Sequence, residues 1–240
     1  MRKDYSMIIC KNFDLNHPIK TMDEWFKECP PKRMDIHWKD GRSAKELARY
    51  MTRNFPKIPQ ELFCILNNYA SSDEILIAPE YVTNFESKGF GKGEGRNHDS
   101  LILMRDSIIG IEAKVDEEFG QYYSSINKKT DNQKSRYEGL YNALFNSAFD
   151  GMIKYQLVTA SVGTILEAID RKKQNAVLLI VTFLKDGHYS ERKVNENVQD
   201  LQYFIQKFVK KSDGSLMAKL ALDNHVNFFI DHLNIKLGTD

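Results

Sequence analysis

Residues 98–120 read HDSLILMRDSIIGIEAKVDEEFG, and this stretch decides the fold of the chain. Two apolar runs flank a short polar turn at residues 105–107, the pattern of an antiparallel strand pair. Asp99 starts the first strand, and Glu112 and Lys114 end the second. Side chains two residues apart on a strand point to one face, and antiparallel pairing can bring Asp99 alongside them. Two carboxylates so close repel unless a cation lies between them, so the pattern predicts a divalent-metal site beside a lysine.

At these residues the chain resembles the PD-(D/E)xK nuclease superfamily, whose members include restriction enzymes and DNA-repair nucleases. Its pattern is an acid, a variable gap, then Asp or Glu, any residue, and Lys. Asp99, Glu112 and Lys114 supply that pattern, and His98 stands where it has Pro. The string EAKVDEEFG, followed later by KYQL, is similar to small bacterial members of the superfamily. The resemblance covers residues 60–185.

The resemblance implies hydrolysis of DNA with Mg²⁺, for which Mn²⁺ would substitute. Asp99 and Glu112 would hold the metal, with the Ala113 carbonyl as a further ligand. Lys114 would orient the attacking water and stabilise the charge that builds on the phosphate. Gln156, in KYQL, matches a glutamine that many members place on the helix after this strand. An ordinary polar position on an amphipathic helix explains Gln156 equally well.

Other polar residues near the hairpin have two interpretations each. Some superfamily members supply an upstream acid, and Glu80 and Glu61 both qualify here. Glu80 ranks first because it leaves a strand beside the hairpin. Asp116 would share a face with the strand acids if the strand continues, and would then support the site from behind. His98 would point to the opposite face of a regular strand, so we expect a structural role for it.

Length and composition allow one large or two small domains, and we favour one, residues 1–240. Its segment 1–70 should be mainly helical, and the resemblance implies a nuclease-like core at 71–240. The chain has 240 residues, 42% of them hydrophobic, enough for a sizeable core. A net charge of +1 says little about partners, because a basic face can lie on a neutral protein. Three widely spaced cysteines indicate reduced thiols. With no signal-peptide or membrane-spanning run, we expect a cytoplasmic protein.

The remaining elements follow from periodicity and capping signals. Capping boxes at 21–24 and 43–46 open two helices, the second to about residue 54, and Pro59 opens a third. The run MIIC predicts an edge strand near the N-terminus. Further strands are expected at 74–85, 176–184 and 226–235, and further helices at 134–149, 152–170 and 197–211.

These elements predict a mixed α/β fold of the α+β kind in which helices flank a central mixed sheet, and the resemblance implies that its core is restriction-endonuclease-like. Pro79 indicates an edge position or a bulge in its strand. The continuous apolar run 176–184 is typical of a strand buried on both faces. It should pair in parallel with the second strand of the hairpin, through a helical crossover.

Two basic or glycine-rich regions leave their roles open. The stretch 89–95, GFGKGEG, lacks the context of a phosphate loop and reads as a plain connection or as a flap that contacts DNA. Several cations either touch phosphates or belong to a solvated surface, and the solvated surface is the better explanation for the helical ones. They are Lys39, Arg42, Lys45 and Arg49 on the second helix and the segment before it, and Lys128 and Lys129 after the hairpin.

Taken together, the residues and the resemblance predict a Mg²⁺-dependent endodeoxyribonuclease acting in restriction, phage defence or repair. Its partner would be double-stranded DNA, no membrane is involved, and a homodimer is allowed. The alternative is a non-catalytic DNA-binding or assembly module that keeps the nuclease fold. Lys114 filling the acid site with a salt bridge would favour that alternative.

Overall fold

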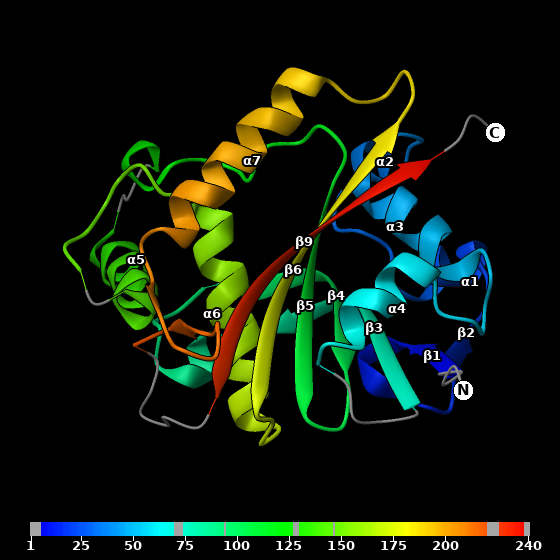
Figure 1. Cartoon of the computed structure of the whole chain (residues 1–240), viewed down its shortest axis with the longest axis horizontal. Coiled ribbons are helices and arrows are strands. Elements are labelled where there is room, and N and C mark those ends of the chain that lie inside the picture. The colour runs from blue at the N-terminus through cyan, green and yellow to red at the C-terminus, as the bar shows by residue number, and fades with distance from the viewer. Residues whose placement is uncertain are drawn as a thin grey trace.

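A computed structural model describes residues 6–69, 74–93, 95–126, 130–145, 147–219 and 226–237. Within these residues nine strands form one mixed sheet in the order β2-β1-β3-β4-β5-β6-β9-β8-β7 (Figure 1). The strands are β1 (Ser6–Cys10), β2 (Pro18–Ile19), β3 (Glu74–Thr83), β4 (Arg96–Leu103), β5 (Ser107–Lys114), β6 (Asn175–Lys185), β7 (Val209–Lys210), β8 (Leu216–Met217) and β9 (Asn227–Leu237). The helices are α1 (Met22–Glu28), α2 (Met34–His37), α3 (Ser43–Thr52), α4 (Gln60–Leu66), α5 (Asp131–Leu144), α6 (Tyr155–Asp170) and α7 (Glu191–Ile205). The expected mixed α/β class is confirmed.

The centre of the sheet has the expected strand arrangement. β3, β4 and β5 form an antiparallel meander, and a turn closed by the Met104 amide on the Ser107 carbonyl at 3.0 Å joins the last two. α5 and α6 then lead into β6. The whole length of β5 pairs in parallel with residues 175–182 of β6. β9 pairs with the other side of β6, also in parallel. The predicted parallel crossover is therefore present.

Helices cover both faces of the sheet (Figure 1). One buried cluster joins α1, α3 and α4 to the face that carries Val177, and the other joins α5, α6 and α7 to the face that carries Leu178. Because neighbouring residues of β6 enter opposite layers, all of them must be apolar. That requirement explains the unbroken run that predicted this strand.

The capping signals have different outcomes. Thr21 accepts from the Glu24 amide and Glu24 reaches back to the Thr21 amide, so the first capping box is confirmed. The second capping box is wrong, because Ser43 is already helical and makes no cap, although α3 begins where that signal predicted a helix. Glu46 is instead buried, where it accepts from the Gly41 amide at 2.7 Å and pairs with Arg49.

Element boundaries also differ from the predicted ones in places. α7 begins six residues before the expected helix at 197–211 and ends six residues earlier, which leaves the end of that range for β7. β1 lies one place in from the sheet edge, since the two-residue β2 pairs with its end. The short strands β2, β7 and β8 carry no periodic signal that the sequence could show.

Candidate functional site

The site begins at an irregularity shared by β3 and β4. Pro79 pairs with Ser100 and Tyr81 with His98, so Glu80 and Asp99 face each other between these pairs. Glu80 has a φ of 47°, in the left-handed region that non-glycine residues seldom adopt. β1 pairs with β3 only as far as Ile77, so Pro79 lies where β3 has a neighbour on one side only. This local edge accommodates the proline and the turn of the backbone after it.

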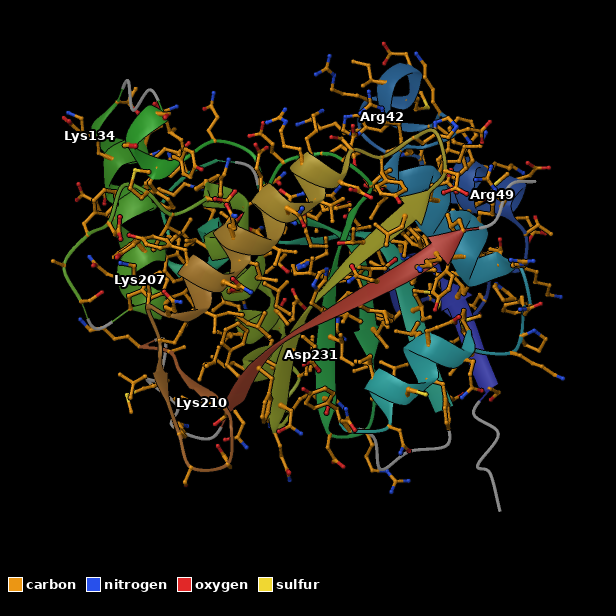
Figure 2. The ribbon with its side chains drawn as sticks, turned by 45° about the horizontal axis from the view of Figure 1, so that its top comes forward. Arg42, Arg49, Lys134, Lys207, Lys210 and Asp231 are labelled. Carbon is orange, nitrogen blue, oxygen red and sulfur yellow. The ribbon has the colours of Figure 1, made fainter. Side chains whose placement is uncertain are left out.

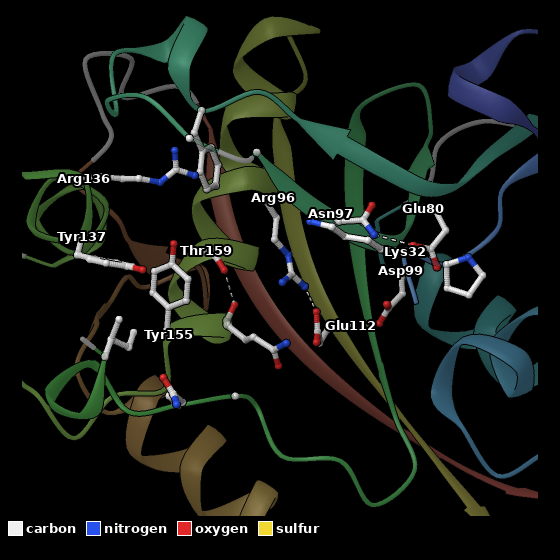
Figure 3. Close-up of a pocket in the computed structure, with 18 of the residues that line it drawn as sticks. Lys32, Glu80, Arg96, Asn97, Asp99, Glu112, Arg136, Tyr137, Tyr155 and Thr159 are labelled. Carbon is white, nitrogen blue, oxygen red and sulfur yellow. Dashed lines mark hydrogen bonds and ion pairs between the residues drawn. The ribbon is translucent and has the colours of Figure 1, made fainter. Parts of the chain in front are cut away.

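The irregularity places two carboxyl groups beside the end of β5. Asp99 Oδ2 accepts from the Ala113 amide at 2.7 Å, which ties the start of β4 to the ExK segment. Glu80 Oε2 accepts from Asn97 Nδ2 at 2.6 Å. Both acids line the same cavity, as Figure 3 shows.

Glu112 stands between two cations. Its side chain is buried and pairs with Lys114 Nζ at 2.7 Å through Oε1 and with Arg96 Nη2 through Oε2. Lys114 is also buried and donates to Gln156 Oε1, 3.2 Å away on the first turn of α6. Its ammonium lies 5.4 Å from the centre of the Phe119 ring. The predicted Asp99, Glu112, Lys114 and Gln156 thus meet at one place.

Burial and mutual repulsion shift the pKa values of these groups. Burial, with the charge of Asp99 adding to it, raises the pKa of Glu80 to about 8. Burial also raises the pKa of Asp99, against the charge of Lys114 and the hydrogen bond from Ala113. For Lys114, burial lowers the pKa to about 8. Burial is thus the main cause of all three shifts, and the charge of Asp99 adds to it at Glu80, whereas Glu112 is paired with two cations.

Glu80, Asp99 and Glu112 border a cavity of about 740 Å³, and Lys114 contacts its lining through Glu112 and Gln156. On one side its lining comes from the N-terminal segment and α3, on the other from α5 and α6, with the acids between them (Figure 3). The side chains of the α5 and α6 side are Gln133, Arg136, Tyr137, Tyr155, Gln156 and Thr159. Pro31, Lys32, His37, Ser43 and Ala44 line the opposite side. The lining contains cationic, amide and aromatic side chains. Such side chains can bind a phosphate group and the nucleotide next to it.

A comparison with protein-family models found a match that covers most of the chain. Residues 18–236 match the model described as a domain of unknown function (DUF6946). The chain belongs to this family. Searches of curated proteins and of solved structures found no match. Among the described residues of this DUF6946 domain, no helix has the length and apolar character needed to cross a bilayer.

Other predicted candidates of the DUF6946 domain lie away from the cavity. Glu61 sits on α4, where it accepts from the Tyr50 hydroxyl at 3.3 Å, so of the two upstream acids only Glu80 reaches the site. β5 ends at Lys114, and Asp116 Oδ2 forms an ion pair with Lys193 Nζ at 3.3 Å. The expectation that Asp116 supports the site is therefore wrong. Lys128 and Lys129 lie outside the described residues.

His98 contradicts the expectation drawn from a regular strand. It is buried against α6, the layer that holds Gln156, since a Cβ on Gly163 would lie 2.8 Å from its Nε2. The backbone of Glu80 explains the change of face. His98 Nε2 lies 3.1 Å from Thr83 Oγ1, and burial holds the histidine pKa well below its usual range. The expected structural role fits this position.

The predicted basic helix face is largely paired. Lys45 and Arg49 both contact Asp40, and Arg42 lies 4.0 Å from Glu117. Figure 2 shows Arg42 and Arg49 at the opposite end of the molecule from Lys134 and Lys207. The cations therefore do not form one continuous stripe on the described surface.

The glycine-rich stretch is held against α5. Asn132 Nδ2 donates to the Lys92 carbonyl at 3.1 Å, and a side chain on Gly93 would meet Arg136 at 3.0 Å. It forms part of the cavity lining through Lys92, Gly93 and Gly95.

Sequence reasoning missed two residues that shape the site. Arg96 pairs with Glu112, and its Nε is buried with no hydrogen-bond partner among the described residues. Glu117 accepts from the Val115 and Ser43 amides, and its charge contributes to the raised pKa of Asp99. Glu117 could have been listed as an acid close after ExK. Arg96 could not, because its pairing depends on the irregular backbone of β3 and β4.

Proposed function

We propose that this protein is a metal-dependent nuclease that hydrolyses phosphodiester bonds in DNA. The observation that carries the proposal is the meeting of Asp99, Glu112, Lys114 and Gln156, from β4, β5 and α6, beside one cavity. The order of the meander, the helices and β6 agrees with the core of the PD-(D/E)xK superfamily that the sequence resembles.

The donors suit Mg²⁺, which prefers carboxylate and carbonyl oxygens. Glu80 and Asp99 face each other, and burial together with the charge of Asp99 raises the pKa of Glu80, an arrangement that a divalent cation between the two carboxyl groups would stabilise. Within the described residues, no three acidic, histidine or cysteine side chains already stand in a ligating arrangement. Asp99, Glu80 and the Ala113 carbonyl would hold the ion, and Glu112 would join once Arg96 leaves it. A bound Mg²⁺ would polarise the phosphate and lower the pKa of the attacking water.

The protein's own residues would position the water and stabilise the charge. Lys114 donates to Gln156 and Glu112, so its ammonium is held at the acid cluster. Burial lowers its pKa to about 8, which keeps a neutral form within reach near neutral pH. The ammonium would orient the attacking water and balance the negative charge that builds on the phosphate oxygens. Gln156 would fix the position of Lys114.

One experiment tests the proposal directly. Supercoiled plasmid, linear duplex, single-stranded DNA and RNA are incubated with the protein in Mg²⁺ or Mn²⁺, with EDTA as the control. We expect cleavage of DNA that depends on the metal and disappears in Asp99→Asn. Failure to cut any of the four substrates with either metal would overturn the nuclease proposal.

A second candidate is a DNA-binding or assembly module without catalysis. The observation that favours it is the pairing of both Glu112 oxygens with Lys114 and Arg96, which leaves this acid neutralised without a metal. Calorimetric titration with Mn²⁺ separates the two candidates. Absence of Mn²⁺ binding together with retained DNA binding would favour the module.

A further inference from the structure

One side of the cavity has a chemistry that hydrolysis does not use. Hydrolysis needs the acids, Lys114 and Gln156, but the cavity continues along α5 and α6 past Arg136, Tyr137 and Tyr155 (Figure 3). Aromatic rings, a guanidinium and nearby glutamine amides are the groups that bind a nucleobase by stacking and by hydrogen bonds to its edge. We call Arg136, Tyr137 and Tyr155 the tyrosine wall.

The tyrosine wall is held in place from behind. The rings of Tyr137 and Tyr155 meet edge to face, with centroids 4.8 Å apart. Each also meets the fully buried Tyr123, at 5.9 Å and 5.4 Å. Both wall tyrosines remain partly exposed, so they have surface to offer a ligand. A platform whose rings are already ordered loses little entropy on binding.

Arg136 completes the wall as a fixed cation. Its side chain is buried, and the guanidinium lies 5.3 Å from the centre of the Phe85 ring. It contacts the glycine-rich stretch on one side and hydrogen-bonds the Tyr155 hydroxyl on the other, where its charge opposes the burial that raises the tyrosine pKa. A cation held beside two rings suits a nucleotide, which carries a base and a phosphate together.

The size of the cavity restricts the form of the nucleic acid. About 740 Å³ falls in the range of roughly 300–1,000 Å³ that encloses one small ligand. The acids and the tyrosine wall border this one space, so a phosphate at the acids would have its own nucleotide within it. In a duplex the bases are stacked inside the helix and cannot reach such a wall until they leave the stack.

We propose that the tyrosine wall is a binding site for an unpaired nucleobase, and that the substrate enters the site as a single strand or with one nucleotide turned out of a duplex. This rests on the proposed nuclease function, and it replaces intact double-stranded DNA as the form that is bound. The base stacks on Tyr137 and Tyr155, and Arg136 faces the backbone beside it.

Binding to short oligonucleotides tests this without any cleavage. The probes are a single-stranded thymidine pentanucleotide, the same backbone without bases, a DNA hairpin whose stable stem holds the five thymidines in a duplex, and the RNA form of the single strand. Affinities for the parent protein are measured by fluorescence anisotropy in Ca²⁺. The variants are Tyr155→Leu and Tyr137→Leu, and the control is Tyr203→Leu, a 38% exposed tyrosine on α7 outside the cavity.

We expect the parent to bind the base-bearing strand between about 5-fold and 150-fold more tightly than the base-free backbone, the scale of one stacked base. Tyr155→Leu and Tyr137→Leu should each reduce that ratio, while Tyr203→Leu leaves it unchanged. The single strand should also bind more tightly than the duplex, and the RNA arm shows whether the sugar matters.

Equal affinity for the base-bearing and base-free strands would overturn the inference, as would a ratio that survives both wall variants. If Tyr155→Leu does not fold, as judged by circular dichroism, Tyr137→Leu decides alone. Base-dependent binding without metal-dependent cleavage would refute the nuclease and leave the base site standing. Cleavage without base-dependent binding would support the nuclease and refute the base site.

Discussion

Replacing Lys114 by Met gives the sharpest test of the site. The thioether chain fills most of the space of the lysine stem, but the ammonium is lost together with its position over the Phe119 ring and its bonds to Glu112 and Gln156. Removing one partner of a buried ion pair costs about 3–5 kcal/mol when the other charge is left alone. Here Arg96 still neutralises Glu112. We therefore expect a loss of only about 1–2 kcal/mol in the free energy of unfolding.

The effect of Lys114→Met on cleavage should be larger than its effect on stability. Loss of one electrostatic stabiliser of the transition state lowers the rate by about 10²–10³-fold, or about 2.7–4 kcal/mol. Single-turnover cleavage in Mg²⁺ measures this loss, and calorimetry with Ca²⁺ measures whether metal binding survives. The matched control is Lys154→Met. Lys154 is as deeply buried as Lys114 but pairs with Glu118 and Asp200 instead of the acid cluster.

The comparison between the two variants decides the interpretation. Lys154→Met should lose stability while its folded molecules cut DNA at the parent rate. If Lys114→Met cuts as fast as the parent, Lys114 is not part of the chemistry and the assigned active site is wrong. If both variants lose cleavage equally, the loss comes from disturbed folding and the role of Lys114 is not supported.

Four further substitutions have definite expected outcomes. Arg96→Met removes a positive charge from Glu112, so we expect Ca²⁺ affinity measured by calorimetry to rise at least ~10-fold; an unchanged Kd would mean that Glu112 is not a ligand. Gly163→Ala should destabilise the protein in urea by about 1 kcal/mol, because crowding of the buried histidine ring at 2.8 Å outweighs the gain in helix propensity. Gly139→Ala, with its nearest contact at 3.6 Å, should stabilise by up to about 1 kcal/mol, and equal effects at both glycines would contradict the packing argument. Burial lowers the pKa of His232 below 6.5, so below that pH the unfolded chain binds a proton more readily than the folded protein. Stability should therefore fall as the pH decreases through 6.5. His232→Gln should reduce the change in melting temperature over this pH range.

The strands that the sequence predicted well are those with an unambiguous burial pattern. All of β5 is buried and β6 contributes to both core layers, so their apolar runs left few alternatives. The ExK spacing then placed Glu112 and Lys114 on one face, as observed. Local periodicity was sufficient here because each residue's environment repeats with the strand.

The features that could not be predicted from the sequence depend on contacts between distant segments. The face on which His98 lies is set by the left-handed backbone at Glu80, and nothing local marks that conformation in a non-glycine residue. The second capping box failed for a similar reason. Glu46 has the right spacing, but a buried position beside Gly41 and Arg49 competes successfully for its carboxylate.

Arg96 connects the two functions that remain open to this fold. It neutralises Glu112, yet its Nε has no partner among the described residues, so this position leaves a buried donor unsatisfied. In a nuclease, the ion pair between Arg96 and Glu112 would have to break when a divalent ion binds. A phosphate in the cavity is a suitable new partner for the guanidinium. A binding module requires no such exchange, because its ion pairs are already complete. The metal affinity of Arg96→Met therefore separates the two functions at a residue that the ExK pattern itself does not contain.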